Sequence, residues 1–269
     1  MSARFSLPRI ALLVVVALAG ACSGVRPQVE HAPGDVRIER VDREFDIPAG
    51  VTRIAITNLT GEINLRSRDE REVGIHAVVQ RMPPGHAHAR FRTRRDGDTF
   101  AIEVGFDGDA AGRVDVAAYL PGDLAVALTT RDGRIAAKRR AGPIEATTES
   151  GPIFASSRDR LRLASRSGTI RAVAIGARWH GDSTVETDTG QVVLMVPTFG
   201  DVVLDAASGG KVSTDFGLTV RTDAGGLHTA RARFGLATSP LHVRSRTGEL
   251  VLEQLVLLGD DTEIPEDDD

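Results

Sequence analysis

Cys22 is the residue whose type and position most clearly indicate a specific chemical modification. It follows the small residues Ala19-Gly20-Ala21 and an apolar run, Ile10 to Leu18, that is too short to cross a bilayer as a helix. Two arginines precede that run, as in an export signal. Ala19-Gly20-Ala21 also fits ordinary signal cleavage, but Cys22 is the only cysteine and cannot form an internal disulfide. The sequence therefore predicts an exported lipoprotein, acylated at Cys22 and anchored to a membrane of the cell envelope, at its periplasmic face or at the cell surface.

Arginine is the second residue type whose spacing suggests chemistry. Guanidinium groups in a row could pair with the phosphates or carboxylates of an anionic glycan or lipid. The alternative is that arginine simply occupies solvated positions in a lysine-poor chain. A first candidate stripe consists of Arg158, Arg160, Arg162, Arg166 and Arg171. A second group consists of Arg221, Arg231, Arg233, Arg244 and Arg246.

Other polar clusters give only weak indications of catalysis or metal binding. His86 and His88 flank one alanine, but no carboxylate or third histidine lies near them in the sequence. The acidic pairs Asp182/Glu186 and Asp201/Asp205 could serve a polysaccharide-cleaving enzyme, yet no acidic cluster recurs at a regular spacing. Trp179, the only tryptophan, could stack on a sugar or fill a gap in the core. We therefore expect no catalytic residues, no metal and no cofactor.

The elements that must position these residues come from a repeated phrase between about residues 126 and 252. Apolar and polar residues alternate, which is typical of a strand with one buried face. Small polar residues and a glycine follow, and then a new strand opens with Ile, Val or Leu. Inward positions before and after each corner lie seven residues apart, as in Leu128/Ile135 and Leu163/Ile170. Glycine suits such a corner because it can adopt positive φ. The predicted corner glycines are Gly61, Gly133, Gly151, Gly168, Gly190, Gly226 and Gly248.

A strand repeat of about 19 residues predicts a β-solenoid, that is, a single-stranded β-helix in an all-β protein. The low aromatic content of 4% fits a narrow core. Two strands around Asp96-Gly97-Asp98 predict a β-hairpin excursion in the N-terminal region. An antiparallel β-sandwich is the alternative fold.

The chain divides into five predicted segments. The net charge of −4 includes seven acidic residues between positions 260 and 269, which are typical of a solvated tail and leave the rest of the chain at about +3. The segments are a lipoprotein signal peptide (1–21), a tether (22–34), an N-terminal β region with a first repeat and the hairpin (35–125), the solenoid (126–258) and an acidic disordered tail (259–269).

A family resemblance covers roughly residues 40–255. Its motifs are Phe45-Asp46-Ile47-Pro48, Thr57 to Ile63, Tyr119-Leu120-Pro121 and the serial Thr/Ser-x-x-Gly-x-Ile corners. Together they resemble the DUF4097 (toastrack) adhesin family of bacterial β-strand-repeat proteins. The resemblance implies a β-helical domain on an exported or membrane-associated envelope protein, with no established catalytic activity.

The sequence thus favours a non-catalytic, lipid-anchored β-solenoid that acts as an interaction or adhesin-like module. Two alternatives remain: a regulatory or sensory envelope protein that binds a membrane partner, and a polysaccharide-active β-helix enzyme. Besides the membrane, the expected partners are an anionic glycan, a lipid or an envelope protein. Nucleic acid conflicts with the export signal.

Overall fold

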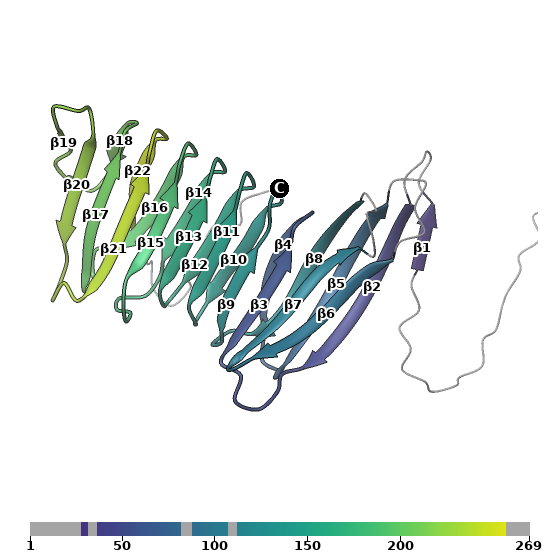
Figure 1. Ribbon diagram of the computed structural model, residues 1–269. Helices are drawn as coiled ribbons and strands as arrows, with labels where there is room; N and C mark the ends of the chain where they lie inside the picture. The colour runs from purple at the N-terminus through teal and green to yellow at the C-terminus, as the bar shows by residue number, and fades with distance from the viewer. Residues whose placement is uncertain (1–27, 32–36, 82–87, 107–111, 257–269) are drawn as a thin grey trace, which may run out of the picture.

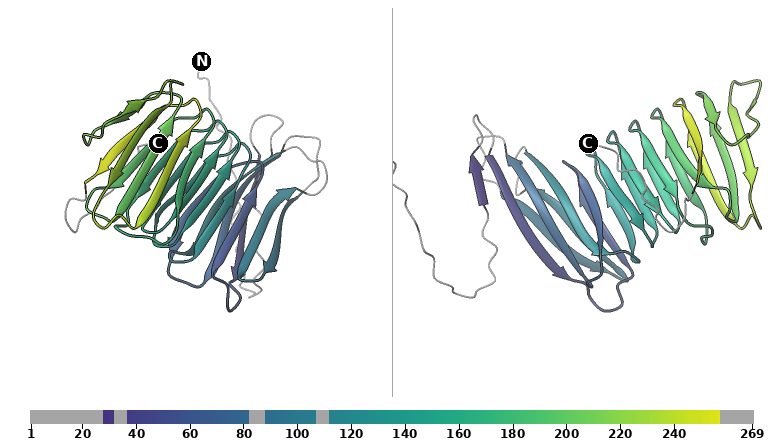
Figure 2. Two further views of the ribbon diagram at one scale, coloured as in Figure 1. Left: turned by 60° about the vertical axis from the view of Figure 1, so that its left-hand side comes forward. Right: turned by 180° about the vertical axis from the view of Figure 1, so that it is seen from behind.

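The computed structural model describes residues 28–31, 37–81, 88–106 and 112–256. Within these ranges the chain forms only strands, arranged in two 11-stranded sheets that we call sheet A and sheet B. The sheets face each other along an elongated rod, with the strands running across its long axis (Figures 1 and 2). The described residues contain no helix that could span a bilayer. The prediction of an all-β solenoid is confirmed.

The middle of the rod is a regular two-sheet solenoid. Successive strands alternate between sheets B and A, and each strand pairs in parallel with the strand one coil later. The strands are β9 (Ala125–Thr129), β10 (Ile135–Arg140), β11 (Ile144–Thr148), β12 (Ile153–Ser157), β13 (Leu161–Ser165), β14 (Ile170–Ala174), β15 (Ser183–Thr187) and β16 (Val192–Pro197).

A narrow core fills the space between the sheets. Ile135, Ile153 and Ile170 are in register on neighbouring strands of sheet A, and their side chains are fully buried. On sheet B, Leu128 and Leu163 face them from alternate positions and are equally buried. The interior is therefore a stack of aliphatic layers, as the alternating pattern predicts.

The C-terminal end departs from a simple winding order. Strand β21 lies between β15 and β17 in sheet B, and β22 lies between β16 and β18 in sheet A. The last coil in the sequence is thus inserted before the last coil in space (Figure 1). Two antiparallel strands, β20 and β19, then close the end of sheet B. The strands are β17 (Val202–Ser208), β18 (Val212–Thr214), β19 (Arg221–Thr222), β20 (His228–Arg233), β21 (Ser239–Ser245) and β22 (Leu250–Leu255).

The N-terminal end combines parallel coils with antiparallel strands. The β3–β4 coil is followed outward by β7 in sheet B and β8 in sheet A. The predicted hairpin is formed by β6 and β7, and β7 is an integral strand of sheet B rather than an excursion. Strands β5, β2 and β1 extend sheet A in antiparallel fashion, and β1 falls within the segment 22–34. The strands are β1 (Gln28–His31), β2 (Arg37–Asp46), β3 (Arg53–Asn58), β4 (Ile63–Arg68), β5 (Glu72–Arg81), β6 (Ala89–Asp96), β7 (Thr99–Phe106) and β8 (Gly112–Pro121).

The corner glycines serve a purpose other than the expected one. Of the predicted set, only Gly61 and Gly226 have positive φ, at 136° and 83°. At Gly168, a Cβ atom would lie 1.9 Å from the carbonyl oxygen of Gly151 in the previous coil. A Cβ atom at Gly133, Gly151, Gly190 or Gly248 would likewise lie 1.8–2.1 Å from a carbonyl oxygen of the neighbouring coil. Backbone-to-backbone proximity between coils therefore demands glycine at these five corners.

Buried hydroxyl groups fix the conformation of the same corners. The backbone N–H of Gly168 donates to Ser165 Oγ at 2.8 Å, and that of Gly151 donates to Thr148 Oγ1 at 3.1 Å. This contact satisfies an N–H group that has no strand partner and explains the Ser/Thr three residues before each glycine. Gly226 differs, because it lies in the turn between β19 and β20, where open space surrounds it.

Candidate functional site

The outer surface of sheet A carries an apolar strip where a solvated solenoid should present polar residues. We call it the apolar face. Its members alternate with buried core residues, so they point away from the interior. Val173 is 8% exposed and the others are half-buried. The apolar face consists of Phe154 on β12, Val173 on β14, Val193 and Met195 on β16, and Val251 on β22.

Strand register brings these side chains together. Val193 pairs with Val251 on one side and with Arg171 on the other, and Arg171 pairs with Phe154. In the next row, Val173 pairs with Met195. Four adjacent strands at about 4.8 Å spacing give a strip roughly 14 Å across.

Charged and polar groups border the apolar face. The ammonium group of Lys138 lies 5.9 Å from the centre of the Phe154 ring, within the range of a cation–π contact. Next to the corner glycines Gly190 and Gly248, Gln191 Nε2 donates to the carboxylate of Glu249 at 3.2 Å. The ammonium group of Lys211 lies 3.7 Å from the same carboxylate. An apolar centre with a polar rim is the arrangement found at protein–protein interfaces.

The outer surface of sheet B is different in character, because charges of both signs cover it. Arg162 is in register with Glu145 and Thr184 on the two neighbouring strands. An open hollow of about 560 Å³ lies beside them, with the side chains of Glu186, Asp188, Arg244 and Arg246 and the apolar Leu227 in its wall. Mixed charge in an open hollow provides no enclosed site for a small molecule.

The first candidate arginine stripe is distributed around the coil. Arg162 projects from sheet B, whereas Arg171 projects from sheet A. Arg158 and Arg160 lie in the turn between β12 and β13, and Arg166 lies in the corner between β13 and β14. The structure therefore does not bring these five residues together on one surface.

Of the acidic pairs, Asp201 and Asp205 are held as ionised carboxylates. Asp201 accepts hydrogen bonds from the backbone N–H of Leu236 and from Arg178, and these contacts lower its pKa. At Asp205, burial raises the pKa, but the hydrogen bonds and charges of Arg244 and Arg231 outweigh it and the net shift is downward. A glycosidase general acid needs a raised pKa. Asp201 and Asp205 are therefore arranged for ion pairing rather than for proton donation.

The other candidate residues from the sequence are Trp179, the two histidines His86 and His88, and Cys22. Trp179 is 4% exposed, and its Nε1 donates to the carbonyl oxygen of Pro240 at 3.2 Å, so it fills the core rather than stacking on a ligand. His88 is exposed, while His86 and Cys22 lie outside the described residues. Within the described ranges, no three His, Cys, Asp or Glu side chains converge as a metal site would require.

Three continuous apolar runs in the sequence indicate the apolar face. Val192 to Val196 is a continuous apolar run, and Ile153-Phe154-Ala155 and Leu250-Val251-Leu252 are shorter ones. Continuous runs indicate strands with apolar residues on both faces, whereas strict alternation indicates one buried face. Neighbouring coils with such runs predict an apolar outer surface.

Comparison with known proteins gives similarities among solved structures only. No family model matches the sequence, so the DUF4097 resemblance stays a prediction, and no curated relative is detected. A proposed cell adhesion protein from Clostridium sporogenes aligns over 81% of this chain and 100% of its own, with a TM-score of 0.48 and 11% identity. A proposed adhesin from Bacteroides fragilis aligns over 80% of this chain and 97% of its own, with a TM-score of 0.33 and 8% identity. A proposed lipid-binding protein from Parabacteroides distasonis aligns over 81% and 97%, with a TM-score of 0.30 and 10% identity. The function of this chain has to be argued from its own residues.

Proposed function

We propose that this protein is a non-catalytic, lipid-anchored interaction module of the cell envelope, adhesin-like in that a rigid rod presents a binding surface. The observation that supports the proposal is the apolar face, where Val193 lies beside Val251 and Val173 lies beside Met195 on the outside of sheet A, with Arg171 between Val193 and Phe154. A group of apolar side chains on the outside of a sheet is typical of a surface that another molecule covers.

The rod suits recognition of a second macromolecule. Its outer sheet surfaces are held rigidly by the stacked core, so little conformational entropy is lost on binding. Each 100 Å² of apolar surface buried there contributes on the order of 2.5 kcal/mol before the costs of association are subtracted. The charged rim around Phe154 and Val193 would then select the partner by charge complementarity. An envelope protein with an extended apolar surface is the partner that this face fits.

Anchoring through Cys22 is the second part of the proposal. Acylation at this residue, together with the lipid attached to its side chain, would provide the two or more acyl chains that stable membrane attachment requires. Strand β1 begins at Gln28, so the rod would start within six residues of the lipid. The anchor would thereby keep the whole rod in the cell envelope, where an envelope partner is concentrated, with the apolar face several coils away from the N-terminal end.

The test is cross-linking of the protein in intact envelopes, followed by separation of membrane and soluble fractions. We expect Cys22→Ser to move the protein into the soluble fraction. We expect Val193→Glu to leave the protein in the membrane fraction but to remove its cross-linked complex, because a charge would be buried at the interface. Thr184→Glu is the matched control, since Thr184 projects from sheet B on the same coil.

Two results would contradict the proposal separately. Unchanged partitioning of Cys22→Ser would refute lipid anchoring. Equal cross-linking by the Val193→Glu and Thr184→Glu proteins would refute the apolar face as the contact surface.

A further inference from the structure

The N-terminal end of the rod carries exposed arginines that belong to no site described so far. Strand β6 is the edge strand of sheet B at that end, and it holds four arginines against one aspartate. Arg43 on the neighbouring part of sheet A lies beside it. We define the terminal arginine cluster as Arg43, Arg92, Arg94 and Arg95, all of which are exposed. Arg92 and Arg94 project from one face of β6, whereas Arg95 projects from the other, together with the Phe91 ring that Arg43 contacts.

The contacts of the cluster leave its charges available. The guanidinium of Arg43 lies 5.9 Å from the centre of the Phe91 ring and donates to the carbonyl oxygen of Asp42 at 2.9 Å. Arg95 Nε donates to the carbonyl oxygen of Gly97 at 3.0 Å. Across the described ranges, none of the four arginines forms an ion pair with a carboxylate.

Elsewhere in the rod, arginines are commonly paired with carboxylates. Arg53 contacts Glu145 at 2.6 Å, and Arg244 contacts Asp205 at 2.8 Å. Arg158, Arg162, Arg221 and Arg233 likewise show no ion pair among the described residues, so the N-terminal cluster is distinguished by the number of its arginines on one edge strand. They require either an external anion or a purely protective role at the sheet edge.

The position of the cluster favours the external anion. Strands β1 and β6 are the edge strands of sheets A and B at the same end of the rod (Figure 1). Gln28 is six positions after Cys22, and this stretch spans at most about 20 Å. If Cys22 is acylated, this end of the rod is held close to the lipid headgroups. This step rests on the proposed function.

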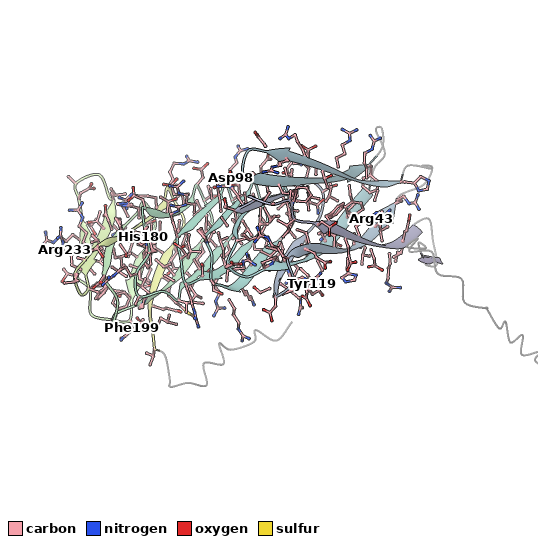
Figure 3. The ribbon with its side chains drawn as sticks, turned by 90° about the horizontal axis from the view of Figure 1, so that it is seen from below. Arg43, Asp98, Tyr119, His180, Phe199 and Arg233 are labelled. Atoms are coloured by element: carbon pink, nitrogen blue, oxygen red, sulfur yellow. The ribbon has the colours of Figure 1, made fainter. Side chains whose placement is uncertain are left out.

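We propose that the terminal arginine cluster binds the phosphate groups of anionic membrane lipids and thereby turns the N-terminal end of the rod toward the bilayer. Guanidinium groups bind phosphate through paired hydrogen bonds and keep their charge at any physiological pH. Each arginine close to an anionic surface strengthens binding by on the order of fivefold. The opposite end of the rod, which carries Arg233, then points away from the membrane (Figure 3).

The experiment uses residues 23–269, which keep every described strand and lack the acylated cysteine. Sedimentation with vesicles measures binding to a mixture of phosphatidylglycerol and phosphatidylcholine, and to phosphatidylcholine alone. We expect binding to the anionic vesicles only, with a steep loss as salt increases. The double variant Arg92→Gln/Arg94→Gln should bind roughly tenfold or more weakly.

The matched control is Arg221→Gln/Arg233→Gln, which removes two exposed arginines from the antiparallel strands at the other end of sheet B. We expect it to bind as the parent does. Inorganic phosphate should compete no better than chloride at equal ionic strength, because the site is a charged surface rather than a pocket for one phosphate ion.

Three outcomes would overturn the inference. They are equal vesicle binding by the two double variants, no preference for anionic vesicles, and self-association of Arg92→Gln/Arg94→Gln with unchanged vesicle binding, which would assign the cluster to edge protection. Because this chain lacks Cys22, none of these outcomes depends on acylation. Failure of the inference and failure of the proposed function are therefore distinguishable.

Discussion

Arg140 is a charged residue whose side chain is buried in the narrow core. Its side chain is fully buried at a bulge in β10, where Arg139 has a positive φ of 56°. One guanidinium nitrogen donates to the carbonyl oxygen of Leu124 at 2.8 Å. Burial lowers the pKa of Arg140 to about 10, and the charge of Asp123 only partly offsets this effect. The group remains charged at neutral pH, so its burial costs free energy of folding.

We predict that Arg140 contributes mainly by filling volume. Arg140→Met should change the free energy of unfolding by less than about 1 kcal/mol, because a side chain of similar length replaces an incompletely paired buried charge. Arg140→Ala should lower it by about 2–5 kcal/mol, because a cavity remains. Urea unfolding of both variants measures the difference. Equal destabilisation by methionine and alanine would show that the charge and its hydrogen bond to Leu124 dominate.

At the scale of the element, the repeating unit is the corner rather than the strand. Each coil closes where a glycine backbone touches the glycine of the previous coil and a Ser or Thr hydroxyl accepts its N–H. This contact sets the distance between neighbouring coils, and the strands supply the aliphatic layers of the core. The corners therefore determine how closely neighbouring coils can stack.

Gly168→Ala tests this role of the corner. The added Cβ would overlap the carbonyl oxygen of Gly151, and backbone atoms must shift to relieve the overlap. We expect the free energy of unfolding to fall by more than about 3 kcal/mol. Gly226→Ala is the matched control, since it has positive φ but open space around it and should cost only about 1 kcal/mol. Similar losses in the two proteins, measured by urea unfolding, would contradict a steric role for Gly168.

The coils of the solenoid could be predicted from the sequence, whereas the reason for the corner glycines could not. The coils were predictable because Ile135, Ile153 and Ile170 repeat at a local spacing that pattern alone reveals. The physical reason for the corner glycines was not predictable, because the crowding atom belongs to a different coil. Gly226 matched the corner pattern but lies in a hairpin turn, since a Gly after polar residues also suits a turn. The scattered arginines show that sequence spacing does not reveal which side of a coil a residue occupies.

At the scale of the whole molecule, the order of coils in space differs from their order in the sequence. Val185 pairs with Val243, 58 positions later, while the intervening strands β17 to β20 lie farther along the rod or close its end. Strand pairs this distant leave no local signal, so neither the insertion of β21 and β22 nor the antiparallel ends could be predicted. The insertion ties the C-terminal third of the chain to the regular solenoid through one coil.

Because one inserted coil joins β17 and β18 to the regular solenoid, removal of that coil should destabilise both strands. A chain that ends at residue 238 lacks only β21 and β22, but β17 and β18 then lose the parallel strands that join them to β15 and β16. We expect the backbone amides of β17 to exchange hydrogen roughly a hundredfold or more faster than in the full chain. The thermal midpoint should be no higher than that of a chain ending at residue 200, because β17 would keep only its antiparallel pairing with β20 and would no longer be joined to the solenoid. In a solenoid wound in sequence order, the longer chain would keep β17 protected and melt at a higher temperature, and that result would contradict the insertion of the last coil.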